Sequence, residues 1–259
     1  MAGPAAEGDH SRRMRDRAPG LRRLARVILP LSALALIVSF FMRNRLPDRS
    51  LVLDPLLQNP AQTKSGVPEP FEVSRKNVTY TVTPLFSYEL WGMIVSYHDA
   101  ASFIDVSHKQ WNDFINTKDI CVIWGKNVET GVYERMTFRN RDFTCFFRYP
   151  DRETRSLFAE DGLSNNHLLP ADELVAATVR KARKGDQVRF KGWLVSYGQK
   201  GAPYSRGSST VRNDRGNGAC EVVFVTEFDI LRQANAGWRT SYRFSLVLVA
   251  LSLVTLIFL

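Results

Sequence analysis

The sequence predicts an α+β fold: one mainly β soluble domain with the character of a small barrel, flanked by two transmembrane helices. Three observations predict it. Residues 27–42 and 244–259 form two uncharged apolar runs. Between them, several runs rich in β-branched and aromatic residues alternate with polar turns. One segment, residues 171–183, has the end signals of an α-helix. A chain of 259 residues supports one folded core when both ends are set aside.

The amino-terminal segment, residues 1–26, is rich in Ala, Gly and Arg and poor in large apolar side chains. Such a composition predicts a disordered tail. It holds much of the net charge of +9. Because its arginines directly precede an apolar run, they are interpreted as a flank that faces lipid headgroups and orients the chain in a bilayer. The alternative, an arm that binds nucleic acid, is not preferred.

Residues 27–42 predict the first transmembrane helix, with Pro30 near its start. The alternative is a cleaved secretory signal, but Phe40, Phe41 and Met42 follow where small residues would mark a cleavage site. An uncleaved signal anchor is therefore preferred. The heavier basic flank lies before this run, so the positive-inside rule places residues 1–26 in the cytoplasm and the domain outside. Arginines on the outer side, such as Arg43, oppose this orientation.

Residues 244–259 predict the second transmembrane helix, preceded by Trp238 and Tyr242 at the position of an aromatic interface belt. The alternative is a buried helix of the soluble domain. Such a helix normally keeps a polar stripe, and this run contains only Ser245, Ser252 and Thr255 as polar residues.

Residues 43–76 contain several prolines and predict an extended tether, and residues 77–231 predict the extracytoplasmic domain. Within it, residues 107–116 and 171–183 predict helices. Residues 187–198 and 220–230 predict paired strands, with a bulge at Gly192. The run GDQVRFKGWL is similar to the opening of small β-barrel modules of the OB class. A split into two domains near Arg155 is the alternative to a single domain.

Candidate reactive residues are few. His167 with Cys220, or with Cys145, could form a thiol nucleophile and its base. The competing interpretation makes Asn165, Asn166 and His167 a loop that caps the following helix, and Cys220 a small core residue. Three cysteines leave at least one unpaired in an oxidising compartment.

A second candidate is a ligand-binding loop that is rich in Gly, Ser and Arg. Arg206, Arg212 and Arg215 could bind an anion there, together with Asn165, Asn166 and His167. The alternative is a solvated loop. A metal site would need His98, His108 and His167 to converge from three distant segments, so neither a metal nor another cofactor is predicted.

The run LSNNHLLPAD, the strand GDQVRFKGWLVSY and the stretch SSTVRNDRGNGACEVVFV resemble a pattern in uncharacterised bacterial envelope proteins with an amino-terminal anchor. Their pattern is a His-Leu-Ile-Pro-Ala motif followed by a Gly-Ala-Cys-Glu strand. Trp193 and the second apolar run depart from it. The resemblance implies a bacterial envelope protein and implies no activity. Together with the signal anchor, the expected location is the bacterial cytoplasmic (inner) membrane.

The sequence therefore favours a membrane-tethered, extracytoplasmic binding or assembly module without catalysis. Its expected partners are the lipid bilayer and other membrane or envelope proteins, not nucleic acid. Two alternatives stay open: an envelope hydrolase that uses the Cys/His pair, and a structural subunit of a larger membrane complex.

Overall fold

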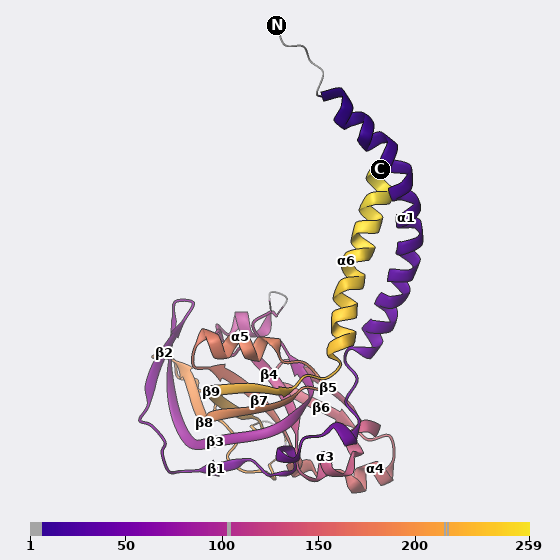
Figure 1. Cartoon of the computed structure of the whole chain (residues 1–259). Coiled ribbons are helices and arrows are strands. Elements are labelled where there is room, and N and C mark those ends of the chain that lie inside the picture. Colours follow the sequence, from indigo (N-terminus) through magenta and orange to yellow (C-terminus); the bar gives the residue numbers. More distant parts are fainter. Residues whose placement is uncertain (1–6, 103–104, 215, 217) are drawn as a thin grey trace. The chain divides into compact units, whose positions relative to one another are not determined.

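The computed structural model describes residues 7–102, 105–214, 216 and 218–259. It divides into two compact units. One is Leu46–Ala234, which contains all of the strands found in the described residues, and the other combines the two chain ends, Met1–Arg45 and Asn235–Leu259. Helices and strands carry the labels shown in Figure 1.

The unit formed by the chain ends consists of two helices that lie side by side, α1 (Glu7–Met42) and α6 (Ala236–Phe258) (Figure 1). The Arg43 guanidinium lies 3.8 Å from the centroid of the Tyr242 ring. Pro19–Met42 and Ala236–Phe258 are both long and apolar enough to cross a membrane. Their large side chains are mostly exposed, with Phe41 at 70% and Phe244 at 67%. A core helix of a soluble domain would bury such side chains.

Two predicted boundaries change in this unit. Helix α1 already begins at Glu7, so residues 7–26 are helical and not disordered as predicted, whereas residues 1–6 lie outside the described part. Ala, Leu and Arg are strong helix formers, so this segment continues the apolar helix backward. Helix α6 begins at Ala236, before the predicted start at Phe244, so it is 23 residues long and reaches the length that a membrane span needs.

The larger unit is built on one mixed sheet whose strand path returns to its start. Strands β3, β4, β7, β9 and β8 are neighbours in that order, and β8 also pairs with β3. All neighbours are antiparallel except β7 and β9, which run parallel. The strands are β1 (Ala61–Thr63), β2 (Phe71–Arg75), β3 (Val78–His98), β4 (Lys118–Ile123), β5 (Thr137–Arg141), β6 (Thr144–Arg148), β7 (Leu163–Pro170), β8 (Gln187–Gln199) and β9 (Glu221–Arg232).

The α+β class is confirmed, and the core shows how the strands are held together. A cluster of buried side chains from β3, β4, β7, β8 and β9 packs together with Val179 of helix α5 (Glu173–Lys181) and with Ala182, which directly follows that helix. Its members include Leu90, Ile94, Ile120, Val122, Trp124, Leu168, Val188, Phe190, Leu194 and Val223. Burial of so many branched and aromatic side chains is the main stabilising contribution to this unit.

Strand β3 joins two segments that the sequence pattern separates. Pro84 interrupts the apolar alternation, yet the strand continues through it with a bulge between Pro84 and Phe86. Strand β2 pairs with β3 up to Val82, and β1 pairs with it from Ser87 onward. Pro84 therefore lies between these two pairings, so neither β1 nor β2 needs a backbone N–H donor at this residue. Proline is tolerated at such positions.

The predicted tether is part of the folded unit. Strands β1 and β2 fall within residues 43–76 and add to the outer edge of β3, and Leu56 is fully buried. Two short 3-10 helices, Arg49–Leu51 and Asp54–Leu57, precede them. Prolines precede or begin these short elements: Pro55 lies in the first turn of the second 3-10 helix, and Pro60 and Pro70 directly precede β1 and β2.

The helices follow their end signals only in part. Helix α5 (Glu173–Lys181) lies within the predicted residues 171–183 and is capped at its start, where the Asp172 carboxylate accepts a hydrogen bond from the Val175 N–H at 2.9 Å. The predicted helix over residues 107–116 shortens to α2 (Ser107–Gln110), which leaves Trp111 60% exposed. The remaining helices are α3 (Lys126–Thr130), α4 (Arg152–Leu157) and two 3-10 turns, Val132–Arg135 and Glu160–Gly162.

Gly192 lies at the predicted bulge, where β8 changes register against β9. A Cβ added to Gly192 would lie 1.9 Å from the Phe224 carbonyl oxygen. We therefore expect Gly192→Ala to lower the free energy of unfolding by about 2 to 3 kcal/mol, because β8 and β9 must separate to admit the methyl group. Urea unfolding of the full chain in detergent, followed by tryptophan fluorescence, measures the change.

The matched control is Gly207→Ala, where an added Cβ meets nothing within 4 Å. Its free energy of unfolding should stay within about 0.5 kcal/mol of the parent value. Equal stability of Gly192→Ala and Gly207→Ala would show that the close approach of β8 to β9 is not required.

Candidate functional site

Three neighbouring strands bring polar residues together on one face. In the antiparallel pair β4–β7, Asp119 lies opposite His167, and Cys121 lies opposite Asn165. In the parallel pair β7–β9, Asn166 lies opposite Glu221, so the preceding Cys220 lies beside Asn165. Because side chains alternate along a strand, Asp119, Asn165, His167 and Cys220 share one face.

Asp119 and His167 form a fully buried pair. The His167 Nδ1 is 2.7 Å from the Asp119 Oδ1, and both side chains are 0% exposed. Burial opposes the charged form of His167, but the adjacent Asp119 charge and hydrogen bond outweigh it and raise the pKa of His167 to about 9. Burial likewise opposes ionisation of Asp119, and its interactions with His167 and Asn116 outweigh it and lower its pKa to about 2. The pair is therefore ionic at neutral pH.

The free thiol of Cys220 also lies close to the His167 side chain. The His167 Nε2 is buried and makes no close hydrogen bond within the described part of the chain. Interaction with the Cys220 thiol is a further contribution that raises the pKa of His167. The Asn165 Nδ2 is 3.6 Å from the Cys220 Sγ. A carboxylate, an imidazole and a thiol thus lie near one another on this face, with an amide donor beside the sulfur.

The β5–β6 hairpin covers this face and is fixed there by a disulfide between Cys121 of β4 and Cys145 of β6. Its turn residue Phe143 has a φ of 64°, a left-handed conformation that is strained for a bulky side chain. The Phe143 carbonyl accepts hydrogen bonds from the Asn165 Nδ2 at 3.2 Å and from the Cys220 Sγ at 3.6 Å. The strained turn therefore orients both groups.

Cys220 opens into a groove of about 970 Å³ between the hairpin turn, the start of β7 and the loop before β9. Asn165, Arg206 and Arg212 also line this groove. The Arg206 guanidinium stacks over the Phe143 ring at 4.4 Å from its centroid. A substrate or ligand can therefore reach the thiol from solvent while His167 and Asp119 remain buried.

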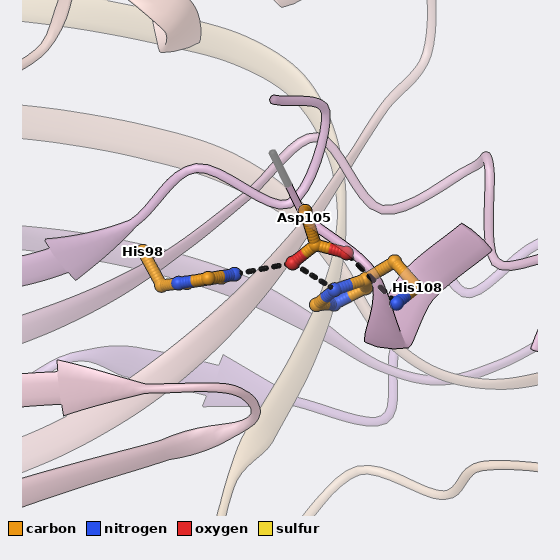
Figure 2. A group of neighbouring side chains, drawn as sticks. All are labelled: His98, Asp105 and His108. Atoms are coloured by element: carbon orange, nitrogen blue, oxygen red, sulfur yellow. Dashed lines mark hydrogen bonds and ion pairs between the residues drawn. The ribbon is translucent and has the colours of Figure 1, made fainter. Parts of the chain in front are cut away.

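A chain of hydrogen bonds connects the buried pair to the surface. Figure 2 shows Asp105 between His98 and His108, with its Oδ2 at 2.5 Å from the His98 Nε2 and 3.0 Å from the His108 Nδ1. The Asn116 Nδ2 then lies 3.2 Å from the His108 Nε2 and 2.8 Å from the Asp119 Oδ1. The partly exposed His98 is thus linked to His167 through polar side chains alone.

A smaller pocket of about 290 Å³ adjoins the groove at Arg206. Trp111 and Tyr204 form its exposed rim, with ring centroids 5.8 Å apart. At its base, the Tyr197 hydroxyl donates to the Asp113 Oδ2 at 2.8 Å, and burial raises the pKa of Asp113. The Asp113 Oδ1 is buried without a hydrogen bond in the described part of the chain. Aromatic faces around an acceptor suit a ring-shaped ligand with a hydroxyl or amino donor.

The structure separates the other predicted site residues. Asn165 to His167 lie within β7, so they do not form the predicted capping loop. Asn166 points to the opposite face, where its Nδ2 donates to the Ser164 Oγ at 2.8 Å. Cys145 has no thiol, because it is disulfide-bonded to Cys121, and is therefore ruled out as the nucleophile.

The three predicted arginines have different surroundings. Arg206 lies between the groove and the smaller pocket. Arg212 forms an ion pair with the buried Glu221, so its charge is largely committed within the domain. Arg215 lies outside the described residues.

Asp119 is the functional residue that the sequence reasoning missed. Aspartate is typical of turn positions, but Asp119 follows Lys118 at the start of an apolar strand in which all six residues are buried. A charged residue inside a strand of that kind is rarely buried without a partner. That signal could have identified Asp119, although only the pairing of β4 with β7 identifies His167 as its partner.

Comparison with protein-family models, with curated proteins and with solved structures yields no match. The family of the chain is therefore not shown, and its function is inferred from the geometry of the Asp119–His167–Cys220 site.

Proposed function

We propose that this chain is a membrane-tethered thiol enzyme in which Cys220 accepts an acyl group from a substrate bound in the groove. The observation that carries the proposal is a partly exposed thiol that lies close to a buried Asp119–His167 ion pair. A cationic imidazole beside a thiol favours the thiolate, which is the nucleophilic form. The buried carboxylate holds the imidazole in one orientation.

Each residue has a defined role in the reaction. The Cys220 sulfur attacks the carbonyl carbon of an ester or amide, and a carbon–sulfur bond forms. The Asn165 Nδ2 is placed to donate to the oxyanion that develops. His167 gives its proton to the leaving oxygen or nitrogen as the bond between that atom and the carbonyl carbon breaks. A water molecule, deprotonated by His167, then attacks the thioester, and the carbon–sulfur bond breaks.

The proposed location is the outer side of a bacterial cytoplasmic membrane, with the amino terminus inside. The arginine-rich flank of α1 supports this orientation through the positive-inside rule. The Cys121–Cys145 disulfide supports an oxidising compartment for the domain, because such bonds persist mainly outside the cytoplasm. The closed strand order, with a parallel β7–β9 pair and a helix before β8, supports a barrel of the OB class.

Alkylation of the detergent-solubilised full chain tests the nucleophile. We expect iodoacetamide at pH 6 to modify Cys220 at least about tenfold faster than a free cysteine, which is mostly protonated at that pH. His167→Gln should return the rate to that of an ordinary thiol. Mass spectrometry without reduction identifies the modified residue, since the other two cysteines are joined.

Acylation by p-nitrophenyl acetate tests the reaction. The parent protein should release p-nitrophenol and carry an acetyl group on Cys220 that is trapped by acid, and Cys220→Ser should carry none. Equal alkylation rates for the parent and His167→Gln, or no acetyl group on Cys220, would overturn the proposal.

The smaller pocket supports a second candidate function, that of a binding module without catalysis. Its exposed Trp111 and Tyr204 rings and the unpaired Asp113 oxygen are features of a site for a ring-shaped ligand. This candidate becomes the preferred function if Cys220 proves to be an ordinary thiol, because the pocket does not depend on it.

A further inference from the structure

Three side chains of metal-ligand type meet at one point outside the proposed catalytic triad. His98 ends β3, Asp105 lies in the following loop, and His108 is in α2 (Figure 2). Their ligand atoms all lie within 4.8 Å of one another. The sequence offers His98 and His108 as metal ligands only together with the distant His167, whereas the structure places them around Asp105.

The geometry points to a zinc site at His98, Asp105 and His108, and we propose that these residues bind a divalent transition-metal ion of the zinc type. Tetrahedral zinc places its ligand atoms about 3.3 Å apart, given metal–ligand distances of about 2.0–2.2 Å. The Asp105 Oδ2 is 2.5 Å from the His98 Nε2 and 3.0 Å from the His108 Nδ1. Small outward shifts of the side chains would therefore admit the ion.

A fourth ligand is close by. The Asp142 Oδ1 lies 3.6 Å from the His98 Nε2, and the other carboxylate oxygen of Asp142 accepts a hydrogen bond from the Ser107 hydroxyl. Two neutral imidazoles and two carboxylates would balance the charge of a divalent ion. Imidazole and carboxylate together suit zinc better than the all-oxygen sets that calcium and magnesium prefer.

The residues around the proposed zinc site hold its ligands in place and leave a path to solvent. Asp105 and His108 are almost fully buried, and the Asp105 Oδ1 accepts the His108 backbone N–H at 2.8 Å. The His108 Nε2, which would not be a ligand atom, contacts the Asn116 amide at 3.2 Å. His98 and Asp142 line a surface hollow of about 470 Å³, which gives an ion a route of entry. Ordered contacts behind the ligands and an entry path are what a metal site requires.

Zinc titration of the chelator-treated full chain in detergent tests the proposal. We expect the parent to retain one zinc ion per chain after gel filtration, measured by elemental mass spectrometry, and to melt at a higher temperature with zinc. His98→Ala, which removes a partly exposed side chain, and Asp142→Asn should each weaken zinc affinity at least about tenfold by isothermal titration calorimetry.

Cys220→Ser is the matched control, because a thiol beside His167 is the competing zinc site. It should bind zinc as the parent does. Zinc binding that is lost in Cys220→Ser and kept in His98→Ala, or a parent that binds no zinc, would overturn the proposal. Neither result depends on the acyl-transfer reaction, so the two proposals fail separately.

Discussion

Replacing Asp119 by asparagine is expected to lower the free energy of unfolding at pH 6 by about 3 kcal/mol and to slow alkylation of Cys220 at least about tenfold. The stability loss arises because the fully buried His167 loses the charge that compensates its own. Without the carboxylate, His167 becomes neutral and no longer favours the thiolate. Urea unfolding and iodoacetamide labelling of the full chain in detergent measure the two effects.

The stability difference between the parent and Asp119→Asn should depend on pH in a defined direction. The folded pKa of His167, about 9, lies above its ordinary value of 6.5, so this contribution is complete below pH 6.5 and is lost as the pH rises through 9. The folded pKa of Asp119, about 2, lies below its ordinary 3.8, so that contribution is complete above pH 3.8 and is lost as the pH falls through 2. The difference should therefore be largest between about pH 4 and 6.5.

The double variant Asp119→Asn with His167→Gln separates a coupled pair from two independent residues. If the pair acts as a unit, the double variant should label no more slowly than His167→Gln alone. A further, additive loss of labelling rate would show that Asp119 acts on Cys220 by another route and would contradict the role assigned to the pair.

The fold could be predicted wherever one segment contains its own signals. The apolar runs of α1 and α6 and the capped helix α5 depend on local sequence alone, and each predicted segment coincides with part of an observed helix, although α1 and α6 both begin earlier than predicted. The membership of β1 and β2 in the sheet could not be found, because it depends on pairing with the distant outer edge of β3. The return of the strand path from β8 to β3 is a long-range contact of the same kind.

The residues of the candidate site also divide into those that local sequence identifies and those that only the fold brings together. Cys220 and His167 could be named from their chemistry, since reactive side chains are scarce in the central region of the sequence. Asp119 and the Cys121–Cys145 disulfide depend on how β4 aligns with β7 and on where the β5–β6 hairpin lies, and neither follows from residue spacing. The disulfide also decides which cysteine remains reactive, a choice that three cysteines alone leave open.

Replacing Arg212 by methionine is expected to destabilise the chain by about 3 kcal/mol at pH 8 and by much less at pH 5. Arg212 forms an ion pair with Glu221, whose side chain is 3% exposed, and donates to the Gln62 Oε1 at 2.8 Å. Burial, opposed by Arg212, raises the pKa of Glu221 to about 7. Without Arg212, the Glu221 carboxylate would be buried beside no countercharge, so it must either stay protonated or destabilise the fold.

The pH dependence follows from the direction of that shift. A carboxyl whose folded pKa lies above its ordinary 4.5 binds more protons when folded, so stability falls as the pH rises above 4.5. Losing Arg212 raises the folded pKa further and steepens that fall. Adding Glu221→Gln to Arg212→Met removes the buried charge and should restore most of the stability at pH 8, as measured by urea unfolding. A double variant as unstable as Arg212→Met would show that packing of the arginine against Tyr88, at 5.3 Å from the ring centroid, matters more than its charge.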